Sequence, residues 1–227
     1  MRRASAVGVR GVLVPGVESG GWTRLRRLAQ THGWRFALGT HPHALPRSQA
    51  VPDQLHGASA IGECGLDGAV GVPWEVQERV LIAHLAVAHE AGLPVILHCW
   101  RAHDRLPPLL RRFGPVRGVM HSYSGGADLV DAYVAAGLHL SFAGATTRPG
   151  ARRPLAAVRR VPRERLLVET DAPDQRPHPL GGRCEPADLV VIVRAVEAAR
   201  GEALEAVLTA NAEALFGAWP GEPPPPG

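Results

Sequence analysis

Seven short apolar runs recur along the chain, and longer segments separate each run from the next. They cover residues 11–14, 34–38, 60–62, 95–97, 118–120, 138–142 and 166–168. Continuous apolar runs of this length are typical of strands that are buried on both faces. Because helix-length segments lie between them, the pattern predicts a parallel sheet with helical crossovers.

The clearest predicted helix extends over residues 74–91. Its apolar stripe has helical spacing and comprises Val76, Val80, Ala83 and Val87. Pro73 precedes the stripe and Gly92 follows it, which are the residues that commonly bound a helix. Two further helical stretches are expected near the end of the chain, over about 187–199 and 202–216.

The number of strands bears on the fold class. A (β/α)₈ barrel closes with eight strands, whereas the sequence shows seven, and residues 4–10 look like the end of a helix that leads into the first run. We therefore expect an α/β fold, a TIM-like barrel whose first strand is missing from the sequence. An open doubly wound sheet needs no eighth strand and is the alternative.

Composition narrows the class of protein. The chain has 227 residues, which suits one domain over residues 1–220, and its four consecutive prolines predict a disordered tail over residues 221–227. All 25 cationic residues are arginine, so catalysis through a lysine is excluded, including a carbamylated lysine bridge between metals. The net charge of +4 is compatible with a polyanionic partner.

The cysteines and the hydropathy indicate a location. The three cysteines lie far apart without a CxxC pair, which excludes a disulfide scaffold and a thiolate zinc site. No apolar run approaches the ~20 residues that a membrane span needs. We therefore expect a cytoplasmic protein, monomeric and without a membrane partner.

Four of the apolar runs are followed by residues that can bind metal. Glu63 follows 60–62, His98 follows 95–97, His121 follows 118–120, and Asp171 comes shortly after 166–168. The carboxyl ends of parallel strands meet at one edge of a barrel, where active sites form. Each residue alone is explained by an ordinary polar strand end, but together they form a set that suits a divalent metal.

The segments around these residues resemble the motifs of TatD-type metal-dependent deoxyribonucleases. The resemblance extends from Gly8 to about Phe216, and four motifs in order carry it: Ile61–Asp67, Pro94–Arg101, Val119–Gly125 and Leu166–Pro173. It implies a barrel of the metal-dependent hydrolase type with two divalent ions, Mg²⁺, Mn²⁺ or Zn²⁺.

The resemblance also implies roles. Glu63 would bridge the two metals, His98 and His121 would bind one of them, and Asp171 would bind the other and orient the nucleophilic water. The catalytic residues would be Asp171 and Glu63. The family begins with an H-x-H pair that this sequence lacks near its start, which suggests a missing segment of about 10–25 residues. A single metal is then the alternative for this chain.

Three further residues are expected to contact substrate. His41-Pro42-His43 is an H-x-H pair, but a proline between the histidines disrupts strand alternation. The segment also resembles the family's later G-x-HP loop, so we assign His41 and His43 to substrate contact. Arg101 follows His98 and is expected to hold a phosphate in bidentate fashion. Asp67 is expected to support the site by a hydrogen bond.

The leading functional hypothesis is a metal-dependent hydrolase that cleaves phosphodiester bonds of DNA or RNA. The resemblance favours exonuclease action on a strand end. One alternative is a weakly active or inactive remnant that lacks the N-terminal ligand pair. The other is a hydrolase of an ester or amide in a small molecule or an aminoacyl-tRNA.

Overall fold

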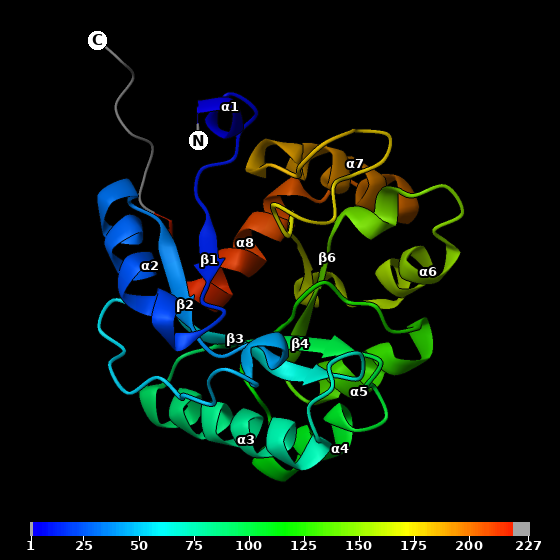
Figure 1. Ribbon diagram of the computed structural model, residues 1–227. Helices are drawn as coiled ribbons and strands as arrows, with labels where there is room; N and C mark the ends of the chain where they lie inside the picture. The colour runs from blue at the N-terminus through cyan, green and yellow to red at the C-terminus, as the bar shows by residue number, and fades with distance from the viewer. Residues whose placement is uncertain (1, 220–227) are drawn as a thin grey trace.

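The computed structural model describes residues 2–219, and in them seven parallel strands form one sheet in sequence order (Figure 1). The strands are β1 (Leu13–Pro15), β2 (Arg35–Leu38), β3 (Ala60–Asp67), β4 (Val95–Trp100), β5 (Gly118–Met120), β6 (Leu138–Phe142) and β7 (Leu166–Val168). Every strand pairs in parallel with the next one along the chain. A doubly wound sheet reverses its strand order at a switch point, so this sequential order confirms the barrel-type arrangement.

The helices of the described chain are α1 (Arg2–Ser5), α2 (Ser19–His32), α3 (Trp74–Ala91), α4 (Leu106–Leu110), α5 (Val130–Ala135), α6 (Arg152–Arg160), α7 (Leu189–Arg200) and α8 (Glu205–Phe216). The bounds predicted for residues 74–91 are confirmed. Gly92 ends that helix in the left-handed conformation, with φ 63°. The two stretches expected near the end of the chain correspond to α7 and α8. The predicted tail over residues 221–227 lies outside the described residues.

Strand β3 is longer than the sequence pattern predicts. It continues from Gly62 to Asp67 and is buried throughout. The pairing register between β3 and β4 shifts between Ile61 and Cys64, which is a bulge. A bulge re-aims the side chains beside it, and here it lies at Glu63. The polar residue that interrupts the apolar run therefore belongs to the strand.

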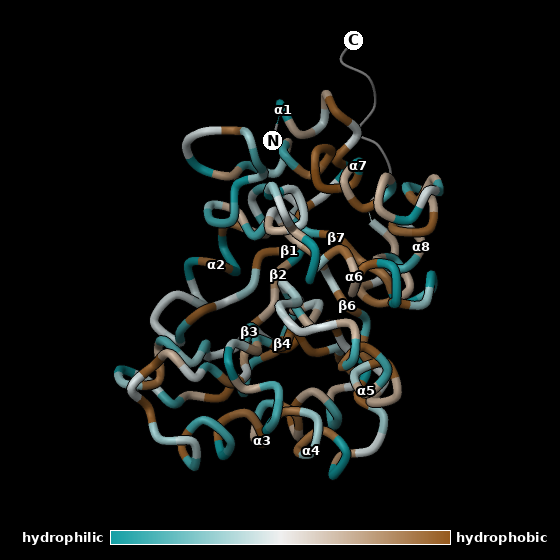
Figure 2. The backbone as a smooth tube through the Cα atoms, turned by 90° about the vertical axis from the view of Figure 1, so that its right-hand side faces the viewer, coloured by the Kyte–Doolittle hydropathy of each residue, from teal (hydrophilic) through white to brown (hydrophobic). Residues whose placement is uncertain are grey.

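Alternation along β4 separates two of the apolar clusters in the described chain. In β4, Val95, Leu97 and Cys99 pack outward in the larger cluster, which includes residues of α3, α4 and α5. Ile96 faces inward and joins a second cluster with Ala37, Ala60, Val119, Leu167 and Leu215. Figure 2 shows the apolar strands at the centre of the molecule. The even-numbered residues of β4 therefore face the interior of the barrel.

Helix α8 closes the amino ends of the strands. Leu215 packs in the inner cluster beside residues near the start of several strands. Arg35, at the start of β2, donates to the carbonyl of Phe216 at 2.6 Å, and Arg117, before β5, donates to that of Leu215 at 2.5 Å. Cationic groups at the last carbonyls of a helix are favourable. The carboxyl ends of the strands are left as the open edge.

Within residues 2–219, no helix combines the length and the apolar content that crossing a bilayer would take.

Replacing Gly65 with alanine should disrupt the contact between β3 and β4. Gly65 has φ +154°, and a Cβ there would lie 2.0 Å from the carbonyl oxygen of His98. We expect Gly65→Ala to lower the free energy of unfolding by about 2 kcal/mol or more, measured by urea denaturation. Gly21→Ala is the control, because a Cβ at Gly21 in α2 meets nothing within 4 Å. Equal stability of the two variants would contradict the close approach.

Candidate metal centre

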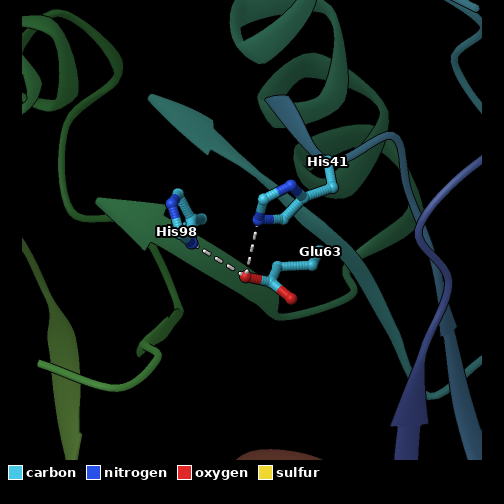
Figure 3. A group of neighbouring side chains, drawn as sticks. All are labelled: His41, Glu63 and His98. Atoms are coloured by element: carbon cyan, nitrogen blue, oxygen red, sulfur yellow. Dashed lines mark hydrogen bonds and ion pairs between the residues drawn. The ribbon is translucent and has the colours of Figure 1, made fainter. Parts of the chain in front are cut away.

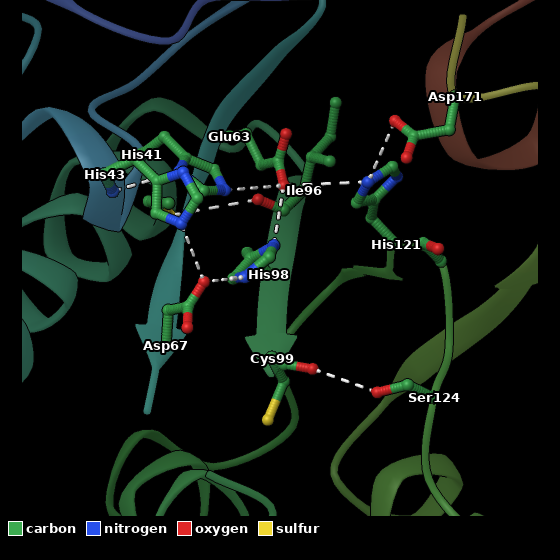
Figure 4. Close-up of polar contacts among 12 residues, drawn as sticks. His41, His43, Glu63, Asp67, Ile96, His98, Cys99, His121, Ser124 and Asp171 are labelled. Atoms are coloured by element: carbon green, nitrogen blue, oxygen red, sulfur yellow. Dashed lines mark hydrogen bonds and ion pairs between the residues drawn. The ribbon is translucent and has the colours of Figure 1, made fainter. Parts of the chain in front are cut away.

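The carboxylate of Glu63 is the centre of a polar cluster at the carboxyl edge of the sheet (Figure 4). Its Oε1 lies 3.1 Å from His98 Nδ1, 3.4 Å from His41 Nε2 and 3.6 Å from His121 Nε2. The Glu63 side chain is only 10% exposed. One buried oxygen is therefore approached by three imidazoles that come from three separate segments.

His41, Glu63 and His98 form the tightest group (Figure 3). One ligand atom from each lies within 4.8 Å of the others. His41 caps a short 3₁₀ turn over Pro42–Ala44, and its Nδ1 accepts the backbone N–H of His43 at 3.1 Å. This bond fixes the ring with Nε2 toward Glu63. The proline therefore begins a turn that directs His41 into the site.

His121 connects Glu63 to the other side of the site. Its Nε2 lies 3.3 Å from Asp171 Oδ1, and its Nδ1 lies 2.8 Å from Glu169 Oε1. Asp171 is held in turn by Gln175, whose side-chain N–H donates to Oδ2 at 2.6 Å. The geometry thus groups His121 with Asp171 and His98 with His41, whereas the resemblance pairs His98 with His121.

Glu169 is the main participant that our sequence analysis did not single out. Its Oε1 also accepts the backbone N–H of Ser122 at 2.5 Å, and its Oε2 accepts the hydroxyl of Ser141 at 2.8 Å. A carboxylate on the outer nitrogen of a histidine fixes the orientation of the ring. Its position two residues before Asp171 was an available signal, since alternate residues of an extended segment share a face.

Asp67 supports the opposite side of the cluster. Its side chain is 3% exposed, and its Oδ2 lies 3.0 Å from His98 Nε2 and 3.2 Å from His43 Nε2. The expected hydrogen bond from Asp67 to the site is therefore present. His98 lies between two carboxylates, Glu63 on one nitrogen and Asp67 on the other.

The remaining predicted residues lie at the outer edge of the cluster. The His43 side chain is 63% exposed and contacts Asp67. Arg101 is exposed, and its guanidinium carbon lies 5.8 Å from the centre of the Trp100 ring. Among residues 2–219 its guanidinium forms no ion pair, so it is available to a ligand. The structure thus brings Glu63, His98, His121, Asp171 and His41 together and leaves His43 and Arg101 around them.

Three strand ends of the site have a strained backbone. Arg101, Ser122 and Asp171 follow β4, β5 and β7 and have positive φ angles of 52°, 44° and 56°. Residues with a Cβ rarely adopt this conformation, which costs about 1–3 kcal/mol and recurs at functional sites. Their position agrees with a binding site at this edge.

Burial and the neighbouring charges oppose each other at this cluster. Burial alone would raise the pKa of Glu63, but His121, His41 and His98 hold it well below its ordinary value. Burial alone would lower the pKa of His121, yet Glu169 and Glu63 raise it well above its ordinary value. Asp171 also keeps a lowered pKa, because its bonds to His121 and Gln175 outweigh its burial. At Glu63, His121 and Asp171, the neighbouring groups of opposite charge therefore outweigh the effect of burial on the pKa.

The donor set suits divalent metal ions. Imidazole nitrogens and carboxylate oxygens together bind zinc and manganese, and carboxylates with water bind magnesium. Three carboxylates, Glu63, Glu169 and Asp171, lie within 3.6 Å of the nitrogens of the His121 ring, an arrangement that favours a cation. His41, Glu63 and His98 supply one group of donors, and Glu63, His121 and Asp171 supply a second that shares Glu63.

Comparison with known proteins identifies relatives over nearly the whole chain. The family described as TatD related DNase matches residues 1–217. A protein of Pectobacterium carotovorum subsp. carotovorum named 3'-5' ssDNA/RNA exonuclease TatD is 39% identical over 88% of this chain and 84% of its own length. A protein of the same name from Escherichia fergusonii is 35% identical over 95% of this chain and 90% of its own length.

Solved structures agree with the fold. The crystal structure of YJJV, a TatD homologue from Escherichia coli K12, superposes with a TM-score of 0.87 at 30% identity, covering 96% of this chain and 90% of that chain. A TatD family hydrolase from Entamoeba histolytica has a TM-score of 0.81 at 16% identity, with 95% and 87% covered, and supports the fold alone.

Replacing Glu169 with glutamine should lower the pKa of His121 in the metal-free protein. Glu169 is the nearest of the charges that raise this pKa. A pKa raised on folding contributes stability that is complete below the unfolded pKa of about 6.5 and is lost as pH rises through the folded pKa. We therefore expect the melting temperature of Glu169→Gln to fall below that of the wild type at acidic pH, with a difference that shrinks in alkaline solution.

The check is an NMR titration of the His121 imidazole in the presence of a chelator, together with melting curves across the same pH range. Glu164→Gln is the control, since Glu164 is exposed and lies on the turn before β7. An unchanged His121 titration in Glu169→Gln would refute the role of this ion pair.

Proposed function

This chain belongs to the TatD related DNase family, and on that premise we propose that it is a divalent-metal-dependent nuclease acting on single-stranded DNA or RNA. It is an exonuclease that hydrolyses phosphodiester bonds at a strand end, in the 3'-5' direction that the names of its relatives state. One observation carries the proposal above all. A single buried oxygen of Glu63 lies within 3.6 Å of three imidazoles, one of which contacts Asp171.

We assign the metals from these contacts. His41, Glu63 and His98 would hold one divalent ion, and Glu63, His121 and Asp171 would hold a second. Divalent ions bound there would lower the pKa of water toward about 7 and offset negative charge on the scissile phosphate. Among residues 2–219, Glu63 is the one carboxylate that contacts both His98 and His121, which supports the role of bridge that we assign to it.

The protein's own groups orient the reaction. Asp171 keeps a lowered pKa, so its carboxylate would accept a hydrogen bond from the attacking water, while Gln175 and His121 hold the carboxylate in place. Glu169 fixes the ring of His121 and Asp67 fixes that of His98. We assign the binding of phosphate oxygens to Arg101 and His43, and the exposure of both side chains supports this role.

The shape of the barrel supports attack on a strand end. Helix α8 packs at the amino ends of several strands, and Glu63 lies at the open carboxyl edge, which supports entry of substrate from that edge. The end of a single strand reaches such an edge more readily than the interior of a duplex does. Hydrolysis of a small ester or amide has no observation in its favour.

The position of His41 supports an active enzyme over a remnant. The remnant hypothesis depends on the lack of the H-x-H ligand pair that the resemblance implies for an N-terminal strand. His41 contributes an imidazole from the loop after β2, and with it each proposed metal has donors from three residues. This supports binding of two ions by residues of the described chain.

We also propose that the protein is cytoplasmic, monomeric and built as a single domain. The three cysteines are buried and free, which supports a reducing compartment such as the cytoplasm. Exposed large hydrophobic side chains in the described chain are few and scattered, which supports a monomer. One sheet with its covering helices accounts for the described residues, in agreement with a single domain over residues 1–220.

Asp171→Asn should abolish most of the nuclease activity. The amide keeps the size of the side chain but loses the negative charge that would accept a hydrogen bond from the attacking water. General base catalysis of this kind contributes about 10²–10⁴-fold to the rate. The measurement is kcat on a 5'-labelled single-stranded oligonucleotide with Mn²⁺ or Mg²⁺. Asp174→Asn is the control, because Asp174 is exposed three residues further on. Wild-type protein that cuts no single-stranded DNA or RNA with either metal would end the proposal.

His41→Ala distinguishes a metal ligand from a substrate contact. Because His41 Nε2 lies 3.4 Å from Glu63, we expect the variant to bind Mn²⁺ about 10–100-fold more weakly in calorimetry. His56→Ala, an exposed histidine of the same segment, should leave metal affinity unchanged. A variant with wild-type metal affinity and a raised KM for oligonucleotide would return His41 to the substrate-contact role.

A further inference from the structure

Trp100 is an exposed tryptophan at the open edge of the barrel. Four large hydrophobic side chains are exposed among residues 2–219, and Trp100, at 44%, is the one aromatic residue among them. Leaving an indole in water forgoes the burial that aromatic side chains normally gain. Trp100 has no part in the proposed metal binding or phosphate contacts.

Trp100 shares a strand face with the metal centre. It is the last residue of β4 and lies two residues after His98, and alternate strand residues point to the same side. Ile96, two residues before His98, faces the interior of the barrel. The inner face of β4 therefore runs from the apolar core through His98 to Trp100 at the opening.

The neighbouring strand brings Trp100 close to the same cluster. Trp100 is in register with Asp67 of β3, and paired residues on adjacent strands lie about 5 Å apart. Asp67 itself contacts both His98 and His43. The backbone of Trp100 is thus one strand spacing away from that of Asp67, whose carboxylate supports the proposed metal ligand.

Cationic and polar groups flank the indole. Arg101 follows it, with a positive φ of 52° and its guanidinium carbon 5.8 Å from the ring centre. His43, 63% exposed, contacts Asp67, the residue in register with Trp100. An exposed aromatic face beside groups that bind phosphate is the combination by which proteins bind single-stranded nucleic acid without sequence preference.

We propose that Trp100 stacks against an unpaired nucleobase of the strand whose terminal phosphodiester lies at Glu63, while Arg101 binds a phosphate next to that base. The inference rests on the proposed nuclease function and extends it to a binding subsite. A base in a duplex has its faces covered by its neighbours, so this platform selects unpaired strands. Every base has a π face, so it tolerates any sequence.

Steady-state kinetics on two substrates tests the subsite. The first is a single-stranded oligo-dT, and the second is an oligonucleotide of equal length in which the terminal nucleotides are abasic. Stacking contributes about 1–3 kcal/mol per base, so Trp100→Ala should raise KM for oligo-dT by roughly 5- to 100-fold and change kcat little. Trp100→Phe should restore most of the affinity.

The abasic substrate separates stacking from a structural role. Without bases to stack, wild type and Trp100→Ala should cleave it with equal KM. An equal loss on both substrates, or a loss of metal affinity in Trp100→Ala, would overturn the subsite. Val7→Ala, which removes an exposed apolar side chain from the amino-terminal segment, is the control and should match wild type on both substrates.

Fluorescence gives a readout that a structural role would not move. A phosphorothioate oligo-dT should quench part of the tryptophan emission of the wild type, and Trp100→Phe should lose that quenching. If the wild type cleaves oligo-dT but Trp100→Ala leaves the KM unchanged and Trp100→Phe leaves the quenching unchanged, the subsite is wrong and the nuclease function stands. If the wild type cleaves neither substrate, the proposed function itself fails.

Discussion

The structure of the site depends on burying one carboxylate among imidazoles. Glu63 is 10% exposed, and a buried carboxylate is costly unless it is paired or binds a cation. Histidines from the loop after β2, from β4 and from the end of β5 supply that pairing. Because each histidine comes from a different segment, the cost is offset only when several strands hold their correct register. The stability of the sheet edge and the geometry of the metal centre are therefore parts of one problem.

Much of this arrangement was predictable from the sequence for a simple reason. A parallel strand buried on both faces is a short apolar run, and the residue that ends the run lies at the carboxyl edge. Strands β5, β6 and β7 have the predicted bounds, and Glu63, His98, His121 and Asp171 meet at that edge as expected. The local pattern sufficed here because period, burial and edge position are all consequences of one repeating unit.

The parts that were not predicted depend on contacts between distant segments. The orientation of His41 comes from a turn in which its own ring accepts the N–H of His43. From the sequence alone, Pro42 predicts only that a strand is interrupted and does not predict this turn. In the sequence Glu169 is one residue of a motif, and its role becomes visible only through its contacts with Ser122, Ser141 and His121. The bulge in β3 is a mismatch with β4, and although Gly62 and Gly65 are typical of an irregular strand, its position follows only from the register with β4. Each of these features requires knowledge of a partner far away in the sequence.

The anchoring of α8 has a consequence for how the molecule assembles. Arg35 and Arg117 have their partners at Leu215 and Phe216, near the end of the described chain. During synthesis the amino-terminal strands emerge long before those carbonyls exist. The outer layer of helix and strand can form progressively, whereas the inner cluster around Ile96 lacks Leu215 until α8 leaves the ribosome. A nascent chain stopped short of α8 would therefore expose an apolar barrel lining and leave Arg35 and Arg117 without these carbonyl partners. Transiently exposed apolar surface of this kind is what makes unfinished chains prone to aggregation.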